Sequence, residues 1–371
     1  MTLVVGGGML VTPGGPRPGS LVLVGDRIAA LDAGRARLDV DAAGGWIAPG
    51  FIDVQINGAA GIDVTTQPHR IPELAAVLPR DGVTAFVPTV ITCEPALRTA
   101  ALAAWAELGD VDGAAPLGLH LEGPMLAAAR KGAHPAEHLA PAAAELVADW
   151  SPAAGVRLVT LAPELPGALD IVRTLADRGV CVAIGHTDCS AETFAAARTA
   201  GARYVTHLFN AMRPFGHRDP GPVGAALADD SVVAGLICDG VHVHPVAVRM
   251  AWQALGPRRL NLVTDAVAAR DADTGQLGSV AVGVRDGGPR NAAGVLAGSV
   301  LTLDQAVRNL VAFTGCSVPD AVATVTSTPA ELLGLHDRGR LSPGARADVT
   351  VLDRDLRVVA TIIGGEVAWR S

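Results

Sequence analysis

From Trp46 onward, short apolar runs alternate with Ala- and Leu-rich segments of helical length. This alternation is typical of a parallel sheet whose strands are joined by crossover helices. Eight of the apolar runs have the length of a strand, at residues 50–56, 83–89, 116–121, 156–161, 180–184, 204–206, 232–237 and 260–264. Because eight such units close a barrel, we predict an α/β protein with a (β/α)₈ TIM-like barrel.

The two ends of the chain carry a different pattern. Residues 1–45 hold short Val and Leu runs broken by Gly and Pro, and residues 342–371 return to two-residue alternation between turns. Both patterns are typical of hairpins, so we predict that the two ends join into one small β-sandwich domain. The barrel is then expected over residues 46–341, with a hairpin insert or lid near the Gly-rich residues 270–300.

Polar side chains stand just past the predicted strands, where a barrel of this kind carries its catalytic groups. Three of them, Glu122, His186 and His207, are hard and borderline metal ligands. Any one histidine is more often structural, but three such residues at three strand ends predict a metal site. The alternative is a Glu–His salt bridge at the barrel mouth. The full set of polar residues past the strands is Gln55 with Asn57, Glu122, Glu164, His186, His207, Asp239 and Asp265.

Asp265 follows the last predicted strand, within Leu262-Val-Thr-Asp-Ala266. Three protein ligands leave one coordination position open for water, as in catalytic zinc sites. A metal there lowers the pKa of its water and polarises a substrate carbonyl. Asp265 is then the natural carboxylate to take the proton of that water and pass it to a leaving group. Its alternative role is as the N-cap of the following segment.

The composition of the chain limits which binding partners and which cellular location we expect. Acidic residues exceed basic ones by 37 to 29 without a basic run, so we expect no nucleic-acid partner. No uncharged apolar stretch of about eighteen residues is present, which argues against a membrane span. No secretory signal is visible, so a cytoplasmic location is expected. The five cysteines are scattered without a C-x-x-C pair, which argues against a disulfide framework and a thiolate zinc site.

Seven short motifs occur in order over most of the chain: Pro49-Gly-Phe-Ile-Asp53, His120-Leu-Glu-Gly-Pro124, Lys131-Gly-Ala-His-Pro135, Gly185-His-Thr187, Thr206-His-Leu-Phe-Asn-Ala-Met212, Asp239-Gly-Val-His242 and Thr264-Asp-Ala266. As a series they resemble the motifs of the N-acetylglucosamine-6-phosphate deacetylases in the amidohydrolase superfamily. The resemblance implies hydrolysis of N-acetylglucosamine 6-phosphate to glucosamine 6-phosphate and acetate by metal-activated water. It matches Glu122, His186 and His207 to the metal ligands, and Asp265 to the general base and acid.

The same resemblance assigns the substrate contacts. His134 matches a residue that hydrogen-bonds the acetyl carbonyl and helps to stabilise the oxyanion, a role that needs a fixed donor. Asn210, the backbone at Ala211, and His242 match contacts to the sugar and the phosphate. Arg218 matches an arginine that reaches the phosphate in a neighbouring subunit, which implies a homodimer. The fork of an arginine side chain suits phosphate on its own chemistry.

The first strand departs from much of the superfamily, in which a His-x-His pair holds a second metal. This chain has Gln55-Ile-Asn57 there. Because amides are poor zinc ligands beside imidazole, we predict one divalent metal ion per subunit. Zinc is the first choice, and Fe, Co or Mn suit the same ligands. Gln55 either hydrogen-bonds the metal-bound water or is a packing or loop residue.

Other functions are compatible with the fold class. A dihydroorotase- or hydantoinase-like site needs a carboxylated lysine at the fourth strand, but that strand ends in Thr160-Leu-Ala-Pro-Glu164 and the only lysine, Lys131, lies in a loop. A deacetylase of another amino-sugar phosphate, such as N-acetylgalactosamine 6-phosphate, would use the same ligands. A catalytically inactive scaffold would have damaged ligands, whereas the three ligands and the acid-base carboxylate are intact here.

Overall fold

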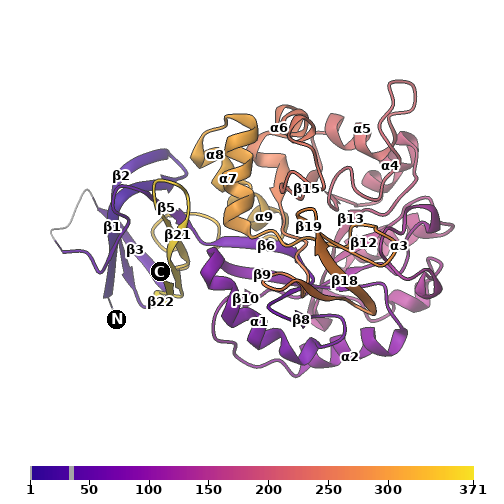
Figure 1. The fold of residues 1–371 in the computed structure, drawn as a ribbon, viewed down its shortest axis with the longest axis horizontal. Coiled ribbons are helices and arrows are strands. Elements are labelled where there is room, and N and C mark those ends of the chain that lie inside the picture. Colours follow the sequence, from indigo (N-terminus) through magenta and orange to yellow (C-terminus); the bar gives the residue numbers. More distant parts are fainter. Residues whose placement is uncertain (1, 33–36) are drawn as a thin grey trace.

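The computed structural model describes residues 2–32 and 37–371. Its main body is a barrel of eight parallel strands that follow one another around the sheet in chain order (Figure 1). Each strand overlaps one of the runs predicted as strands, so the predicted barrel is confirmed. The strands are β6 (Phe51–Ile56), β9 (Val83–Ile91), β11 (Leu119–Glu122), β12 (Val156–Leu161), β13 (Cys181–Ile184), β14 (Tyr204–Val205), β15 (Val233–Leu236) and β16 (Leu260–Leu262).

The barrel strands form because their sequences are mostly apolar, with a few polar residues such as Asp53, Gln55 and Glu122 buried among them. Every residue of β6 and β9 is buried, as parallel strands require when helices cover their outer face. A short strand, β10 (Ala115–Pro116), pairs with β9. The covering helices are α1 (Ile71–Val77), α2 (Pro95–Ala106), α3 (Ala168–Asp177), α4 (Ala191–Thr199), α5 (Gly221–Ala228), α6 (Pro245–Arg259), α7 (Leu303–Thr314), α8 (Val318–Ala323) and α9 (Ser327–Leu332).

Several connections are made of short 3₁₀ helices. Two of them flank α1, and the other four lie in the connection between β11 and β12. They are η1 (Pro68–Arg70), η2 (Leu78–Asp81), η3 (Ala128–Arg130), η4 (Ala136–His138), η5 (Ala144–Val147) and η6 (Pro152–Ala154).

The barrel has a seam between its last strand, β16, and its first, β6. Within the described residues, no strand ladder joins these two strands. Backbone between α8 and α9 enters the seam instead: Leu262 N–H donates to Thr324 O (3.2 Å), and Ile52 N–H donates to Val325 O (2.8 Å). The barrel is therefore nearly closed, and its last gap is filled by chain from outside the eight strands.

Both ends of the chain contribute to a second sheet, which is set apart from the barrel (Figure 1). Its hydrogen-bonded order is β22-β21-β20-β5-β1-β2-β3, with β4 beside β1. Val5, Leu21, Ile47 and Val351 belong to its own apolar cluster. The predicted terminal β domain is thus a separate sheet domain. Its strands are β1 (Thr2–Thr12), β2 (Gly15–Val24), β3 (Arg27–Asp32), β4 (Val40–Asp41), β5 (Trp46–Pro49), β20 (Val349–Leu352), β21 (Val358–Ile363) and β22 (Glu366–Arg370).

Strand β5 lies in the range that the sequence pattern assigned to the barrel. It pairs with β1 in parallel and with β20 in antiparallel orientation, so it belongs to the terminal sheet. Only Gly50 separates β5 from β6, and the two strands read as one apolar run. The expected boundary after residue 45 therefore falls one strand too early.

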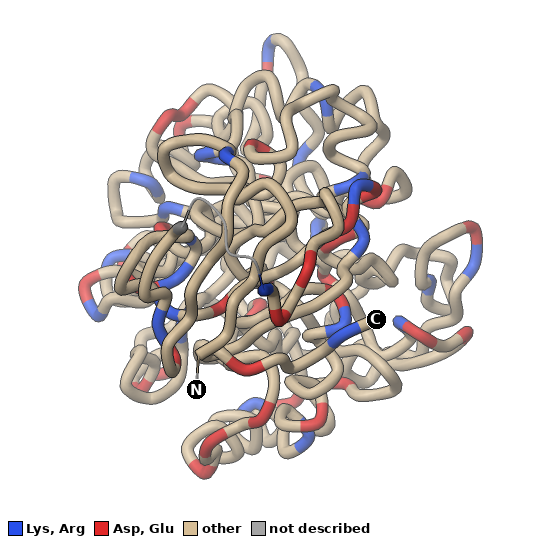
Figure 2. Tube along the Cα trace, turned by 90° about the vertical axis from the view of Figure 1, so that its left-hand side faces the viewer, with Lys and Arg blue, Asp and Glu red and all other residues tan. Residues whose placement is uncertain are grey.

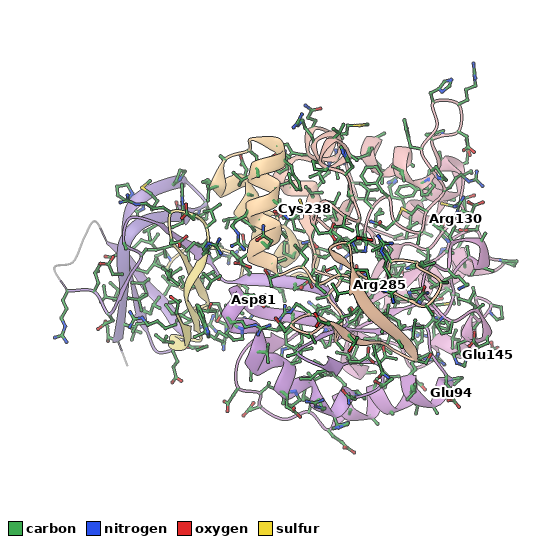
Figure 3. All side chains as sticks on the ribbon, in the orientation of Figure 1. Asp81, Glu94, Arg130, Glu145, Cys238 and Arg285 are labelled. Carbon is green, nitrogen blue, oxygen red and sulfur yellow. The ribbon has the colours of Figure 1, made fainter. Side chains whose placement is uncertain are left out.

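The terminal sheet packs against the N-terminal ends of the barrel strands. The hydroxyl of Thr350 donates to Gly82 O (2.7 Å), and the hydroxyl of Thr361 donates to Pro79 O (2.6 Å). Figure 3 marks Asp81 on this side of the barrel. The C-terminal ends of the strands, at the opposite end of the barrel, are left free of the terminal sheet.

The Gly-rich insert is a three-stranded antiparallel sheet, so the expected hairpin has a third strand. Leu277 and Ala297 of the insert share an apolar cluster with Ile91, the last residue of β9, and with Ala133, which follows β11. Figure 3 marks Arg285, the last residue of β18, in front of the barrel. The strands are β17 (Thr274–Leu277), β18 (Val280–Arg285) and β19 (Gly288–Arg290), and a smaller hairpin after β6 contains β7 (Gly58–Ala59) and β8 (Ile62–Asp63).

The surface carries charges of both signs. Basic and acidic residues are interspersed on the side of the molecule shown in Figure 2. Over residues 2–32 and 37–371, the longest helix is α6 with 15 residues, and none is long and apolar enough to cross a membrane.

Candidate metal and catalytic site

Three parallel strands bring the predicted metal ligands to one point. Glu122 is the last residue of β11, and His186 and His207 lie just beyond β13 and β14. They converge because the carboxyl ends of parallel strands meet at the same edge of a barrel. All three residues are buried, and their ligand atoms lie within 4.8 Å of one another.

The three ligand atoms form a tight triangle. Glu122 Oε1 lies 3.1 Å from His186 Nε2 and 3.0 Å from His207 Nε2, and the two ring nitrogens are 3.2 Å apart. Tetrahedral ligands at roughly 2.0–2.1 Å from zinc are about 3.3 Å from one another. The triangle therefore fits one divalent ion, and its mixed oxygen and nitrogen donors suit zinc, iron, cobalt or manganese.

The hydrogen bonding fits a metal better than a plain salt bridge. His186 Nδ1 lies 2.9 Å from Arg130 O, which can only accept, so Nδ1 carries the proton and Nε2 keeps its lone pair. A salt bridge from both imidazoles would instead place two protons between ring nitrogens that are 3.2 Å apart. Burial raises the pKa of Glu122, but its close contacts with His186 and His207 outweigh burial and hold this pKa well below its usual range.

His134 stands beside the triangle as a neutral hydrogen-bond donor. Its Nε2 lies 3.9 Å from Glu122 Oε2, and its Nδ1 accepts a hydrogen bond from the backbone N–H of Thr92 (3.4 Å). Burial, followed by the nearby charge of His186, lowers the pKa of His134 to about 3. A neutral ring whose Nδ1 accepts must carry its proton on Nε2, and this is the nitrogen next to the triangle.

Asp265 has one carboxylate oxygen that is held by the protein. Its Oδ1 accepts hydrogen bonds from Gln55 Nε2 (3.1 Å) and Asn57 Nδ2 (2.8 Å), whereas Oδ2 has no such partner in the part of the chain that is described. Burial, followed by the charge of Glu122, raises the pKa of Asp265 to about 7. Because no helix begins between Asp265 and α7 (Leu303) in this described part of the chain, the N-cap alternative for Asp265 is wrong.

The side-chain amides of Gln55 and Asn57, at the end of the first barrel strand, donate hydrogen bonds to the carboxylates of Glu122 and Asp265. Gln55 is fully buried, and its Nε2 lies 3.4 Å from Glu122 Oε1 as well as near Asp265. One amide group thus donates toward both carboxylates, which lowers their mutual repulsion. The two acids use the N–H groups of Gln55. Contact between Gln55 and a metal-bound water stays a prediction.

The chain turns sharply where it carries these groups. The φ angles are 49° at His186, 28° at His207, 51° at Ala211 and 49° at Asp265. This left-handed region is costly for residues other than glycine. Such conformations persist where surrounding contacts hold them, and they are concentrated at functional sites.

A cavity of about 200 Å³ adjoins the triangle and Asp265. Its polar lining includes Asn210, the backbone at Ala211 and His242, three of the predicted substrate contacts. Most of its apolar lining comes from the end of β9 and from the insert, and includes Ile91, Leu277, Val295, Leu296 and Ala297. The insert is therefore a wall of the cavity in addition to covering the barrel end.

His242 is held in one orientation by Asp239. The Nδ1 of His242 lies 2.6 Å from Asp239 Oδ2, and Asp239 Oδ1 accepts the backbone N–H groups of Val241 and His242, both at 2.8 Å. Burial raises the pKa of Asp239, but the hydrogen bond with His242 outweighs it, so the pKa lies below its usual value. The ionised Asp239 keeps a proton on Nδ1, which leaves Nε2 of a neutral ring free to accept.

Arg218 does not line the cavity of its own chain. It is exposed, in the loop between β14 and α5. The single chain brings together Glu122, His186, His207, His134 and Asp265, but not Arg218. The role of Arg218 at a neighbouring subunit stays a prediction.

Sequence reasoning missed groups that act through their backbone or through packing. Thr92 holds His134 with its N–H, and Leu277 and Ala297 line the cavity from a segment predicted only as a hairpin or lid. Asn57 was expected only as a poor metal ligand, yet it holds Asp265. Its place at a strand end was the single signal available, because the other contacts join residues far apart in the chain.

The chain is similar to several known proteins. It matches the amidohydrolase family over residues 46–368. It is 41% identical over 350 residues to the N-acetylglucosamine-6-phosphate deacetylase of Homo sapiens, with 89% of this chain and 85% of that protein covered. The enzyme of the same name from Bacillus subtilis is 38% identical over 334 residues, with 87% and 84% covered.

Two solved structures agree over nearly all residues. N-acetylglucosamine-6-phosphate deacetylase from Thermotoga maritima aligns with a TM-score of 0.91 at 32% identity, with both chains fully covered. A mutant of the Mycobacterium smegmatis enzyme, solved in complex with N-acetyl-D-glucosamine-6-phosphate, aligns with a TM-score of 0.92 at 34% identity over 99% of each chain.

The metal triangle can be tested by removing its charge. Glu122→Gln should weaken binding of zinc or iron by more than about 100-fold, because a neutral amide replaces the ionised ligand between two imidazoles. Metal content after dialysis and calorimetric titration measure the effect. Glu137→Gln, an exposed residue of the same β11–β12 connection, is the matched control. A Glu122→Gln protein that keeps one tightly bound ion would contradict the assignment.

The buried Asp265 predicts a pH effect on the stability of the metal-free protein. Because its pKa is raised from 3.8 to about 7, its neutral acid is favoured in the folded chain, and its contribution to stability is lost as the pH rises from about 4 through about 7. Asp265→Asn lacks this loss. The unfolding midpoint of the variant should therefore gain on wild type between pH 5 and pH 8, while the exposed Asp170→Asn should not. A constant difference would refute the prediction.

Proposed function

This chain belongs to the amidohydrolase family, within it to the N-acetylglucosamine-6-phosphate deacetylases, and we propose that it hydrolyses N-acetylglucosamine 6-phosphate to glucosamine 6-phosphate and acetate. One observation carries the proposal: a set of metal-ligand residues, a neutral N–H donor and a buried carboxylate line the same cavity. Amide hydrolysis needs these three parts, namely an activated water, an oxyanion donor and a proton shuttle.

Glu122, His186 and His207 would hold the ion. When bound there, a divalent metal lowers the pKa of a water ligand and polarises the acetyl carbonyl. Their burial keeps bulk water away from the reacting amide, which strengthens the electrostatic interactions inside the site. Gln55 adds an N–H beside Glu122 and so helps to keep this carboxylate ionised.

His134 donates its Nε2–H to the acetyl oxygen as negative charge develops on it. The neutral state of the ring and the Thr92 bond at Nδ1 support this role, because they fix both the tautomer and the ring direction. A donor that is already oriented needs no rearrangement during the reaction. We therefore assign His134 to oxyanion stabilisation.

Asp265 moves the proton. Two amides occupy its Oδ1, so Oδ2 is the oxygen available to accept a proton from the attacking water and to return it to the departing amine nitrogen. A carboxyl group with a pKa of about 7 can both take up and release a proton near neutral pH. The amides of Gln55 and Asn57 thus anchor the carboxylate through Oδ1 and leave Oδ2 for proton transfer.

The sugar phosphate would be bound by the polar lining of the cavity. Nε2 of His242, held by Asp239, suits a sugar hydroxyl, and Asn210 and the backbone at Ala211 offer further polar groups. The apolar residues Ile91 and Leu277 suit the acetyl methyl. Arg218 would reach the phosphate of a substrate in a second subunit of a homodimer, since it is exposed and does not line the cavity of its own chain.

An assay of acetate release tests the reaction and the sugar together. N-acetylglucosamine 6-phosphate should be cleaved with a higher kcat/KM than its C4 epimer, N-acetylgalactosamine 6-phosphate, and Asp265→Asn should lower kcat by at least about 100-fold with the metal still bound. A preference for the epimer would favour the alternative deacetylase. Metal-loaded wild type without activity on either sugar would favour an inactive scaffold.

Mixed dimers test the role of Arg218. Arg218→Ala should raise KM for the phosphorylated sugar roughly 10- to 100-fold, as expected for loss of a charged hydrogen bond, and leave KM for the unphosphorylated sugar nearly unchanged. A dimer with one Arg218→Ala subunit and one Asp265→Asn subunit should regain one site of normal KM, because the second subunit supplies the arginine. If this hybrid keeps the high KM, the arginine does not act between subunits.

A further inference from the structure

Asp53 lies in the seam of the barrel, directly behind the site. It is fully buried in β6, within the motif Pro49-Gly-Phe-Ile-Asp53, and it does not line the cavity. All of its hydrogen bonds cross or run along the seam. Oδ2 accepts from the hydroxyl of Thr264 (2.5 Å), and Oδ1 lies 3.3 Å from Thr264 N and 3.2 Å from Gln55 N, accepting from both.

The Thr264 hydroxyl closes a turn of the backbone that contains Asp265. It donates to Asp53 on one strand and accepts the backbone N–H of Ala266 (3.2 Å), so its two bonds bracket Asp265. A hydroxyl that accepts from the residue two positions on is a side-chain turn of the backbone. Asp265 sits inside this turn with φ at 49°, a conformation that needs outside contacts to persist.

The second group that Asp53 holds also acts on Asp265. Gln55 gives its backbone N–H to Asp53 and its side-chain N–H to Asp265 Oδ1. One buried carboxylate therefore fixes both the backbone that carries Asp265 and a donor that orients it. Both contacts therefore fix the position of the Asp265 oxygens, one through Thr264 after β16 and the other through Gln55 of β6.

Closure of the seam does not by itself require a charged group. The backbone N–H of Asp265 already donates to Gln55 O (2.9 Å), Asn57 N–H donates to Ala266 O (2.8 Å), and Val325 fills the lower part of the seam. Burying a carboxylate is costly, and an apolar side chain would pack a seam at lower cost. The directed bonds of Asp53 point to a role in geometry.

We propose that Asp53 is a positioning residue that acts through the Thr264 hydroxyl to hold Asp265 in its left-handed turn with Oδ2 toward the substrate. The inference rests on the proposed function, in which Asp265 transfers the proton. It predicts that loss of the hydroxyl affects proton transfer and leaves substrate binding and the metal in place, because Asp53 and Thr264 are not metal ligands and do not themselves line the cavity.

The test is a comparison of Thr264→Val with Thr264→Ser in the metal-loaded enzyme. Valine keeps the branched shape and removes the hydroxyl, whereas serine keeps the hydroxyl. Thr264→Val should lower kcat roughly 10- to 100-fold, the effect of a small misplacement of a reacting group, with KM within about two-fold and one bound metal. Thr264→Ser should restore most of kcat. A merely structural role would not separate kcat from KM in this way.

Thr326→Val is the matched control, since Thr326 is buried and its hydroxyl donates to a backbone carbonyl away from the site (Val322 O, 2.8 Å). It should lower the unfolding midpoint without lowering kcat. Wild-type kcat in Thr264→Val, or an equal loss of kcat in Thr326→Val, would overturn the proposal. If Thr264→Val does not fold, Asp53→Asn is judged by the same criteria. Wild type that releases no acetate would instead refute the proposed function.

Discussion

The site depends on keeping one buried carboxylate ionised. Glu122 has lost most of its contact with water, and close contacts with His186 and His207 outweigh the cost of that burial. Asp265 lines the same cavity and is held by the neutral amides of Gln55 and Asn57 in place of imidazoles. In one cavity, the pKa of Glu122 is therefore lowered and the pKa of Asp265 is raised. This difference suits Glu122 to metal binding and Asp265 to proton transfer.

The barrel and the metal triangle could be predicted from the sequence because both follow from simple periodic rules. Fully buried parallel strands are continuous apolar runs, so the pattern located all eight of them. Their carboxyl ends must meet at one edge, so Glu122, His186 and His207 had to lie near one another. The chemistry of these three residues then indicated a metal, and the triangle of their ligand atoms has the size that such an ion needs.

The remaining features depend on contacts that no local pattern records. The tautomer of His134 is set by the backbone of Thr92, and a backbone N–H is present at almost every position of any sequence. The seam is filled by Val325, which lies far along the chain from β6. The boundary at β5 was missed because Gly50 alone marks the change from one sheet to the other. Neighbours in space, and not neighbours in sequence, decide these features.

The terminal sheet is built from strands near both ends of the chain, and this affects how it forms during biosynthesis. Strand β5 pairs with β20, so that Pro49 lies opposite Val349. During translation the N-terminal strands therefore leave the ribosome long before their partner exists, and β5 must wait with an unpaired edge while the whole barrel is made. Unpaired edges invite association with other chains. Completion of the sheet by the last strands thus makes protection from misassembly one of the final events of folding.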